Sequence, residues 1–222
     1  MLQHGLYLKF LKPKPSNPKN PMQFFKSNSV RASKLAVLFL LLSFSPSILS
    51  AQTWQIDGSH TNVMFSIDHM MISETTGRFK IIEGTITSSK ADFSDAMIDV
   101  KIPISSIDTD NADRDKHLQA DDFFDSAKYP YMTFKSTSIK KGSGNDVTVT
   151  GNLTIKGKTK PVTLKGKMMP ATKDPWGNMR AGFGKLTTTI DRQDFGVAGG
   201  GAMVGDEVRL TINAEVIQPA GK

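Results

Sequence analysis

The stretch Glu207 to Val216, EVRLTINAEV, decides the fold class of this chain. Its apolar residues Val208, Leu210, Ile212, Ala214 and Val216 alternate strictly with polar ones. Because successive side chains of a β-strand point to opposite faces, this pattern gives an extended segment one apolar and one hydrophilic face. The stretch therefore predicts a strand that packs one face against a core.

The same alternation recurs through most of the chain after residue 52. It is clear at residues 97–104, 147–155 and 162–168, and further candidate strands are residues 63–67, 79–87, 131–139 and 181–190. Turn-forming sequences rich in Gly, Asn and Asp separate them, at residues 142–146, 157–158, 174–178 and 199–201. At least eight antiparallel strands with such connections predict an all-β domain, either a closed barrel or a sandwich.

Two local signals refine this prediction. Glycines inside predicted strands, such as Gly84 and Gly151, mark bends or bulges and favour the barrel. One substantial helix is predicted over residues 111–124, with Asp110 or Asn111 as its N-cap and acidic residues in its first turn. Residues 69–74 are expected to add a short helical turn.

Residues 1–51 are predicted to be a targeting sequence and not part of the fold. The apolar run LAVLFLLL at residues 35–42 follows basic residues and precedes a stretch of small residues that ends at Ala51. This order is typical of a secretory signal peptide, and the run is shorter than the about 20 residues that span a bilayer. We expect Met22 to be the true start and residues 52–222 to be exported to the periplasm; a retained membrane anchor is the alternative.

Charge and cysteine content narrow the functional class. Seven of the 28 Lys and Arg residues lie in residues 1–51, which contain no acid, so 28 − 7 = 21 bases face 21 acids in the rest. Residues 52–222 are therefore neutral, and the excess positive charge of the whole chain does not indicate nucleic-acid binding. The absence of Cys excludes a disulfide framework and thiolate metal sites.

Short motifs in residues 52–222 resemble those of the YceI-like family. They include WQIDGSH at residues 54–60, FSIDH at 65–69, RDKHL at 114–118, DFFD at 122–125, GNLTIKG at 151–157, RQDFG at 192–196 and VGD at 204–206. Their order and spacing cover residues 53–217. The resemblance implies an extended, eight-stranded antiparallel β-barrel of lipocalin-like form with one short α-helix. It also implies that the lumen holds a long isoprenoid or fatty-acyl lipid for sequestration or transport, and it does not imply catalysis, a metal or a cofactor.

Flexible apolar side chains are the expected lining of such a lumen, because they adapt to irregular contents. The predicted lining residues are Phe65, Phe79, Met97, Phe134 and Phe183. The wider pool of methionines is Met64, Met70, Met71, Met97, Met132, Met168, Met169, Met179 and Met203. The alternative is that most of these residues fill an ordinary core.

Polar candidates for contact with the ligand are fewer. Arg78, Arg114 and Arg192 could each bind a phosphate or carboxylate head group, because an arginine fork matches such anions. Arg192 lies close to two aspartates in the sequence, so an internal ion pair is its alternative role. His60 is the remaining candidate ligand-binding residue.

Other chemistries fit the sequence less well. The spacing of His60, His69 and His117 matches no short zinc motif, and no G-x-S-x-G sequence marks a serine hydrolase. The main alternative function is a periplasmic enzyme that acts on a lipid or quinone inside the barrel, with His60 or His69 as acid or base. An adhesive β-sandwich is a third reading. The expected partners are a long-chain lipid, transiently a membrane, and a second copy of the chain in a homodimer.

Overall fold

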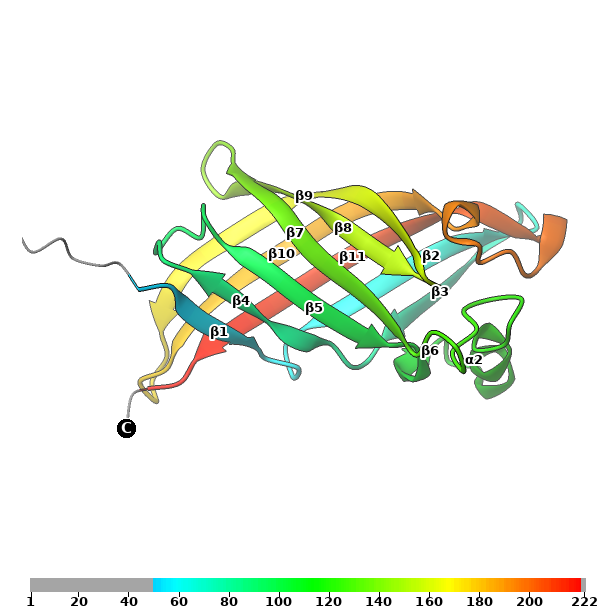
Figure 1. The fold of residues 1–222 in the computed structure, drawn as a ribbon, viewed down its shortest axis with the longest axis horizontal. Helices are drawn as coiled ribbons and strands as arrows, with labels where there is room; N and C mark the ends of the chain where they lie inside the picture. Colours follow the sequence, from blue (N-terminus) through cyan, green and yellow to red (C-terminus); the bar gives the residue numbers. More distant parts are fainter. Residues whose placement is uncertain (1–49, 221–222) are drawn as a thin grey trace, which may run out of the picture. The chain divides into compact units, whose positions relative to one another are not determined.

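A computed structural model describes residues 50–220 of the chain. The predicted leader lies outside the described residues except for its last two positions. The described residues form an antiparallel β-barrel with a short helix at one end (Figure 1). Within this part of the chain, no helix combines the length and the apolar character needed to cross a membrane.

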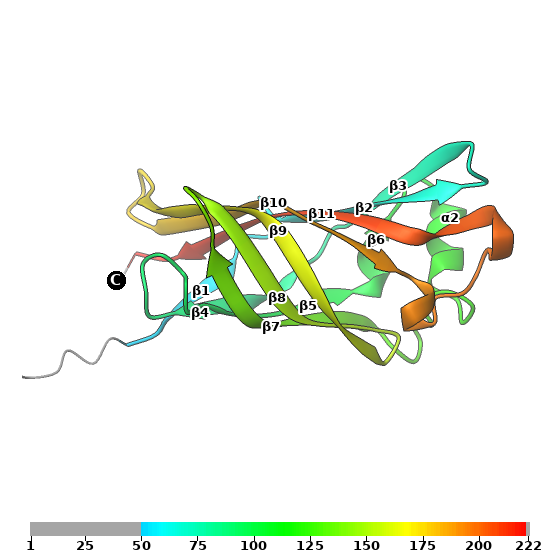
Figure 2. The same ribbon diagram turned by 90° about the horizontal axis from the view of Figure 1, so that it is seen from above.

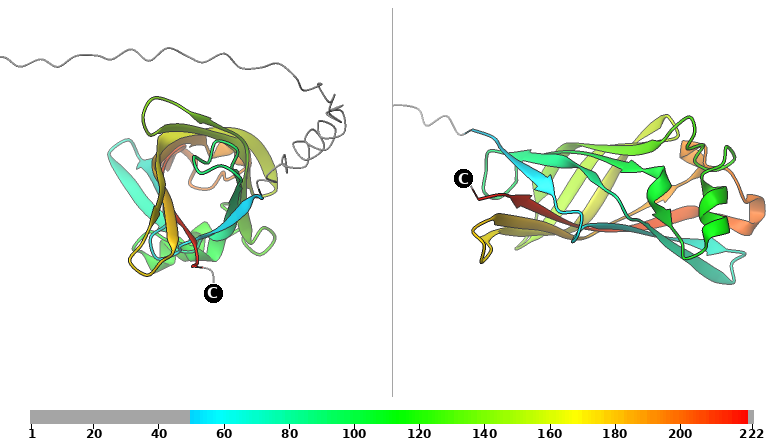
Figure 3. Two further views of the ribbon diagram at one scale, coloured as in Figure 1. Left: turned by 90° about the vertical axis from the view of Figure 1, so that its left-hand side faces the viewer. Right: turned by 90° about the horizontal axis from the view of Figure 1, so that it is seen from below.

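Eleven strand segments make up the barrel wall. The six shorter ones are β1 (Gln52–Ile56), β2 (Asn62–His69), β3 (Ser73–Phe79), β4 (Glu83–Ser88), β5 (Met97–Pro103) and β6 (Ile107–Asp108). The five longer ones are β7 (Tyr131–Lys141), β8 (Asp146–Ile155), β9 (Lys158–Lys173), β10 (Met179–Asp191) and β11 (Val204–Gln218). Figure 3 (left) looks along the barrel and shows these segments as a ring.

The pairing of the short segments reduces the eleven to eight strand positions. β1 and β2 both pair with β11 and share one position. β4 pairs with β1 and β3 pairs with β2, so β3 and β4 share the next position. β5 pairs with β4 and β6 pairs with β3, so β5 and β6 share the third. Three interrupted strands and five continuous ones therefore surround the lumen. The pairing of Ile56 with Val216 closes the ring. The predicted eight-stranded antiparallel barrel is confirmed.

Bulges and one glycine bend the wall. The register between β10 and β11 shifts between Phe183 and Leu186, and the register between β7 and β8 shifts next to Gly151. Gly84 has a φ of 146°, and a Cβ atom there would overlap the carbonyl oxygen of Asp99 on β5. Because only glycine fits both constraints, this position allows the close approach of β4 and β5.

The strands predicted from alternation are present, except that residues 79–87 are divided between the end of β3 and the strand β4. The two helical predictions need correction. Residues 69–74 are not helical: β2 runs to His69, β3 begins at Ser73, and residues 70–72 form a tight turn in which the N–H of Ile72 donates to the carbonyl of His69 over 3.0 Å. The helix α2 is Ala112–Leu118 and not residues 111–124. It starts as predicted, because the Asn111 side chain accepts the N–H of Arg114. It ends early because the N–H of Ala120 bonds three residues back, to His117.

Apolar side chains gather in two clusters, one at each end of the barrel. At one end, Trp54, Phe93 and Phe183 stack with ring centroids 5.1 and 6.1 Å apart and are almost completely buried. We call these three residues the plug. The other end contains Phe79, Phe123 and further residues beneath α2 and the two short 3₁₀ helices, η2 (Gln193–Phe195) and η3 (Gly201–Met203). Figure 2 shows α2 and the β2–β3 hairpin at the end opposite the C-terminus.

Candidate functional site: the barrel cavity

A cavity of about 630 Å³ occupies the barrel between the plug and α2. Its volume lies within the range of about 300–1,000 Å³ that small-molecule sites occupy. Its innermost wall includes Phe183 and Leu186, and its other end is bounded by α2 and by the chain around Met203. The barrel is therefore packed at one end and hollow toward the other.

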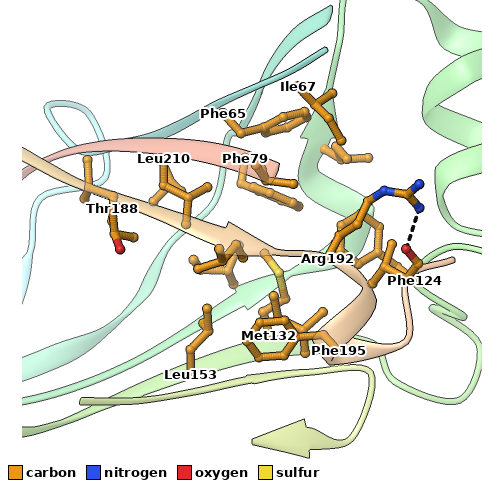
Figure 4. A pocket seen from close by; sticks show the side chains of 18 of the residues that line it. Phe65, Ile67, Phe79, Phe124, Met132, Leu153, Thr188, Arg192, Phe195 and Leu210 are labelled. Atoms are coloured by element: carbon orange, nitrogen blue, oxygen red, sulfur yellow. Dashed lines mark hydrogen bonds between the residues drawn. The ribbon is translucent and has the colours of Figure 1, made fainter. Parts of the chain in front are cut away.

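The alternation that predicts the strands also explains the apolar wall. Val208, Leu210, Ile212 and Ala214 of β11 all line the cavity, and so do Ile98, Val100 and Ile102 of β5. The intervening residues point outward because side chains alternate across a strand. Figure 4 shows Leu210 and Leu153 on opposite sides of the lumen, with Phe79 and Met132 between them and the helical end.

Four of the five predicted apolar lining residues line the cavity, namely Phe65, Phe79, Phe134 and Phe183. Phe65 and Phe79 lie 5.8 Å apart by ring centroid, and they come from the paired strands β2 and β3. Phe124, which is not among the predicted residues, also lines the cavity, and its ring meets that of Phe79 edge-on at 6.1 Å. The Phe123-Phe124 pair in the motif DFFD, a few residues after the helix, is the sequence signal for it.

The placement of Met97 is corrected by the structure. Met97 lies outside the cavity wall, and 66% of its surface is exposed. It precedes Ile98 on β5, so the alternation that turns Ile98 inward turns Met97 outward. Of the methionines proposed as a pool of lumen residues, Met132 and Met203 are the ones that line the cavity.

Arg192 lines the cavity, but its guanidinium is bound by the protein. Its Nε donates to the carbonyl of Gly205 at 2.8 Å, and Nη1 donates to the carbonyls of Val197 and Gly199 at 2.7 and 2.8 Å. Its Nη2 bonds the carbonyl of Val204 and lies 3.2 Å from a carboxylate oxygen of Asp206. Four of its five N–H groups thus donate to backbone carbonyls, and Asp206 lies beside Nη2, so Arg192 holds the 197–206 segment and is not free to bind a head group. The acid it pairs with comes from β11, not from its neighbours in sequence.

Arg78 and His60 also lie outside the cavity wall. Arg78 pairs with Asp108 across β3 and β6, with 2.9 Å between Nη2 and the carboxylate, and its side chain is 56% exposed. Lys80, the N–H of Asp110 and Arg78 together lower the pKa of Asp108 to about 2. The imidazole Nδ1 of His60 lies 3.0 Å from Asp57 in the turn between β1 and β2. The predicted ligand contacts of these two residues are therefore not supported by their positions.

His60 instead belongs to an ion-pair cluster at the plugged end. Within residues 50–220, the one group close enough to share a metal ion is Asp57, His60 and Glu215. Arg180 already occupies it, because Nη1 bonds Asp57 at 2.7 Å and also bonds Glu215. The hydrogen bond from Arg180, followed by that from His60, lowers the pKa of Asp57 to about 2. The cluster joins β1, β10 and β11 where the ring closes.

Arg114 is the arginine that faces the open end of the cavity with donors to spare. Its Nε donates to the hydroxyl of Thr109 at 2.8 Å and Nη2 donates to the carbonyl of Thr109. Among the described residues, the other three N–H groups of its guanidinium have no hydrogen-bond partner. His69 and His117 line the same cavity, and His117 Nε2 lies 3.1 Å from Asp122. An apolar lumen thus ends in a rim with cationic and hydrogen-bonding groups.

The fold and sequence match known proteins over most of the chain. Residues 54–216 match the model of the YceI-like domain. Protein YceI of Escherichia coli O17:K52:H18 is 40% identical over 191 residues, which is 85% of this chain and 99% of that protein. The Campylobacter jejuni YCEI crystal structure is 34% identical with a TM-score of 0.61, covering 68% of this chain and 90% of that one.

Two further solved structures share the fold. Burkholderia cenocepacia BcnA is 25% identical with a TM-score of 0.61, and the match covers 72% of this chain and 98% of that chain. A polyisoprenoid binding domain from Saccharophagus degradans has a TM-score of 0.56 over 75% of this chain and 98% of its own, and at 16% identity the likeness concerns the fold alone. Together with the family model and the E. coli relative, the barrel identifies this chain as a member of the YceI-like family.

Proposed function

We propose that this protein is an exported lipid-binding protein that holds a long isoprenoid or fatty-acyl chain in the barrel lumen, for sequestration or transport. The observation that carries the proposal is the cavity of about 630 Å³ with apolar walls along its length and polar groups at one end. This distribution matches a molecule with a long apolar tail and one polar end. The name of the Saccharophagus degradans domain, a protein of the same fold, is consistent with such a ligand.

The energetics suit a carrier. Taking a methylene group from water into an apolar lumen is favourable by about 0.8 kcal/mol, so a long tail would be held very firmly against water. A lipid tail in a membrane is already in hydrocarbon, however, and its transfer into the lumen is close to balance. The protein can then both load and release its ligand, and the fit of the tail and the head-group contacts set the affinity.

The polar end of the ligand is assigned to Arg114. Its three unengaged N–H groups suit an anionic phosphate or carboxylate, because charge-assisted hydrogen bonds to arginine are short and strong. We propose the periplasm as the site of action, on the strength of the signal-like pattern in residues 1–51. The homodimer remains a prediction.

The enzymatic alternative has weaker support. His60 lies outside the cavity wall, and its imidazole pairs with Asp57. His69 lines the cavity, but the adjacent carboxylate of Asp68 accepts a hydrogen bond from Arg209 at 2.7 Å. Neither His60 nor His69 therefore combines a place on the cavity wall with an available carboxylate to orient its imidazole.

Native mass spectrometry of the protein, purified without detergent from a periplasmic extract, tests the proposal directly. The expected result is a stoichiometric adduct that organic extraction identifies as an isoprenoid or acyl lipid. The same spectra report whether the protein is a monomer or a dimer. Protein that is free of adduct and fails to take up added polyprenyl or fatty-acyl lipids would contradict the proposal.

A matched pair of arginine variants tests the head-group assignment. Arg114→Gln should weaken the binding of a fatty acid about tenfold, while the binding of the alcohol of equal chain length should change little. Arg78→Gln is the control, because Arg78 is also exposed and also hydrogen-bonded but lies outside the cavity wall. Equal effects of the two substitutions on fatty-acid binding would remove Arg114 from the site.

A further inference from the structure

The turn between β2 and β3 exposes large apolar side chains to solvent. Met71 is 97% exposed, Ile72 81% and Met70 49%. Met203, 57% exposed, lies beside them, because its carbonyl accepts the N–H of Met70 at 2.8 Å. We call these four residues the apolar tip. Scattered single apolar residues are normal on a protein surface, but a contiguous group of this kind indicates an interaction site.

The backbone of the turn makes this composition more unusual. Met70 and Met71 have φ angles of 54° and 55°, which are left-handed values at both central positions of the turn. A β-turn with positive φ at both central positions favours Asn-Gly there, because most side chains are strained at positive φ. The turn therefore adopts a demanding geometry with two large apolar residues where small or polar ones would be more stable. Its geometry alone does not account for these side chains.

The apolar tip is continuous with the open end of the cavity. His69 and Ser73, which flank the turn, line the cavity, and so does Met203 itself. In Figure 2 the β2–β3 hairpin extends from the same end of the barrel as α2 and the segment that contains η3. A surface that covered the tip would therefore also cover the entrance.

The charges around the tip do not favour an anionic partner. Nη2 of Arg209 lies 2.7 Å from Asp68 and 2.7 Å from Glu74, so one base meets two acids at the foot of the hairpin. Peripheral proteins that bind anionic membranes carry an excess of Lys and Arg beside their apolar residues. At the foot of this hairpin the acidic residues outnumber the basic one. This favours a partner that binds the tip through hydrocarbon and not through charge.

We propose that the apolar tip inserts into the interfacial region of a lipid bilayer and brings the cavity entrance against the membrane. This inference rests on the proposed function for its cargo: a lipid tail that moves between bilayer and lumen then stays in apolar surroundings throughout. The partner is the bilayer itself, bound through its hydrocarbon and without a requirement for anionic head groups.

The double substitution Met70→Asn, Met71→Gly is the sharpest test, because it removes the apolar groups and supplies the residues that the turn prefers. In flotation assays with phosphatidylcholine vesicles, the wild type should bind, and the variant should bind at least tenfold more weakly. The melting temperature of the variant should be equal to or higher than that of the wild type. Added phosphatidylglycerol should not strengthen wild-type binding. Equal binding of the two proteins, or strong dependence on phosphatidylglycerol, would overturn the proposal.

Trp176→Ser provides the matched control. Trp176 is 78% exposed at the tip of the turn between β9 and β10, at the opposite end of the barrel. This variant should bind vesicles as the wild type does, and loss of its binding would assign the membrane contact to the wrong end. Sedimentation without vesicles tests the competing occupant, a second copy of the chain. If the wild type self-associates and the double substitution Met70→Asn, Met71→Gly abolishes this, the tip is a dimer interface and the membrane proposal fails.

Uptake of cis-parinaric acid added from ethanol separates this inference from the proposed function. If the double variant takes up the probe normally but exchanges it slowly with vesicles, both ideas stand. If the wild type takes up no lipid from any source yet binds vesicles through the tip, the lipid-carrier function fails and the membrane contact remains. If the probe is taken up but neither protein binds vesicles, only the membrane contact fails.

Discussion

The plugged and hollow ends of this barrel are built from the same kind of alternating strand, yet one is solid and the other is not. At the plugged end Trp54, Phe93 and Phe183 are at most 4% exposed. At the hollow end the wall residues Phe65 and Phe124 are only half-buried and border the cavity. The ring of strands alone does not decide whether a barrel is filled.

A connecting segment contributes to this difference. Phe93 belongs to the link between β4 and β5 and is fully buried, with a left-handed φ of 54°. Asp95 fixes this link by accepting hydrogen bonds from the hydroxyls of Ser88 and Ser89 at 2.6 and 2.5 Å. No strand position supplies that ring. The plugged end is thus filled by a loop ring, Phe93, that packs between the strand residues Trp54 and Phe183.

The largest expected effect tests this contrast with two phenylalanines. Phe93→Ala should reduce the free energy of unfolding by about 3–5 kcal/mol, because it empties a packed site. Phe65→Ala should cost about 1 kcal/mol, since one side of that ring already faces the cavity. Urea denaturation monitored by circular dichroism measures both values. Similar losses would show that the two ends are equally packed.

Arg192 donates hydrogen bonds to four backbone carbonyls at the hollow end, and replacing it tests whether these bonds stabilise the 197–206 segment. Arg192→Lys should lower the free energy of unfolding by about 2–4 kcal/mol, because an ammonium group has three donors and cannot satisfy the same buried carbonyls. Thermal unfolding measures the loss. Arg78→Lys, at an exposed ion pair, should change stability by less than about 0.5 kcal/mol. An unchanged free energy of unfolding in Arg192→Lys would mean that the 197–206 segment does not depend on the guanidinium.

Adding volume should affect the two ends in opposite ways. Val216→Phe enlarges a side chain with no exposure at the plugged end and should cost about 1–3 kcal/mol. Leu210→Trp adds volume toward the cavity and should cost less than about 1 kcal/mol while reducing the amount of lipid bound. Calorimetry and native mass spectrometry provide the two readouts. Full lipid occupancy in Leu210→Trp would place the ligand elsewhere.

The smallest expected effect concerns acid sensitivity at the plugged end. The pKa of Asp57 is lowered to about 2 from an unperturbed 3.8, mainly by Arg180. A lowered pKa in the folded state gives stability that is present above pH 4 and is lost as the pH falls toward 2. The melting temperature of the wild type should therefore fall over this range more steeply than that of Arg180→Gln. Parallel curves would show that the ion pair does not contribute.

The sequence predicts the strands and the inward face well, because both follow from a local period of two. The cavity positions of β11 are the apolar residues of EVRLTINAEV, and Met97 was misplaced only because its chemistry was given more weight than its position in the alternation. The plug could not be predicted in this way. Phe93 lies in a connecting segment, and its burial depends on long-range packing against Trp54 and Phe183.

The role of Arg192 was also beyond local patterns. An arginine between two aspartates suggests a nearby ion pair, but its partners are backbone carbonyls of residues 197–205 and the carboxylate of Asp206. Backbone acceptors carry no sequence signal. Arg114 has the same chemistry, but it donates only to Thr109 among the described residues, a difference that only the positions of the surrounding chain reveal.

The closing seam of the barrel also determines how the molecule must fold. Every other neighbouring pair of strand positions is adjacent along the chain, whereas the seam joins β1 and β2 to β11, as in the pairing of Ile56 with Val216. Contacts between such distant segments form slowly, because the entropy of a long loop is lost before the contacts are gained. Until the final strand is in place, the sheet has two open edges that can pair with other chains. The docking of β11 therefore controls both the completion of folding and the period during which the chain is prone to aggregate.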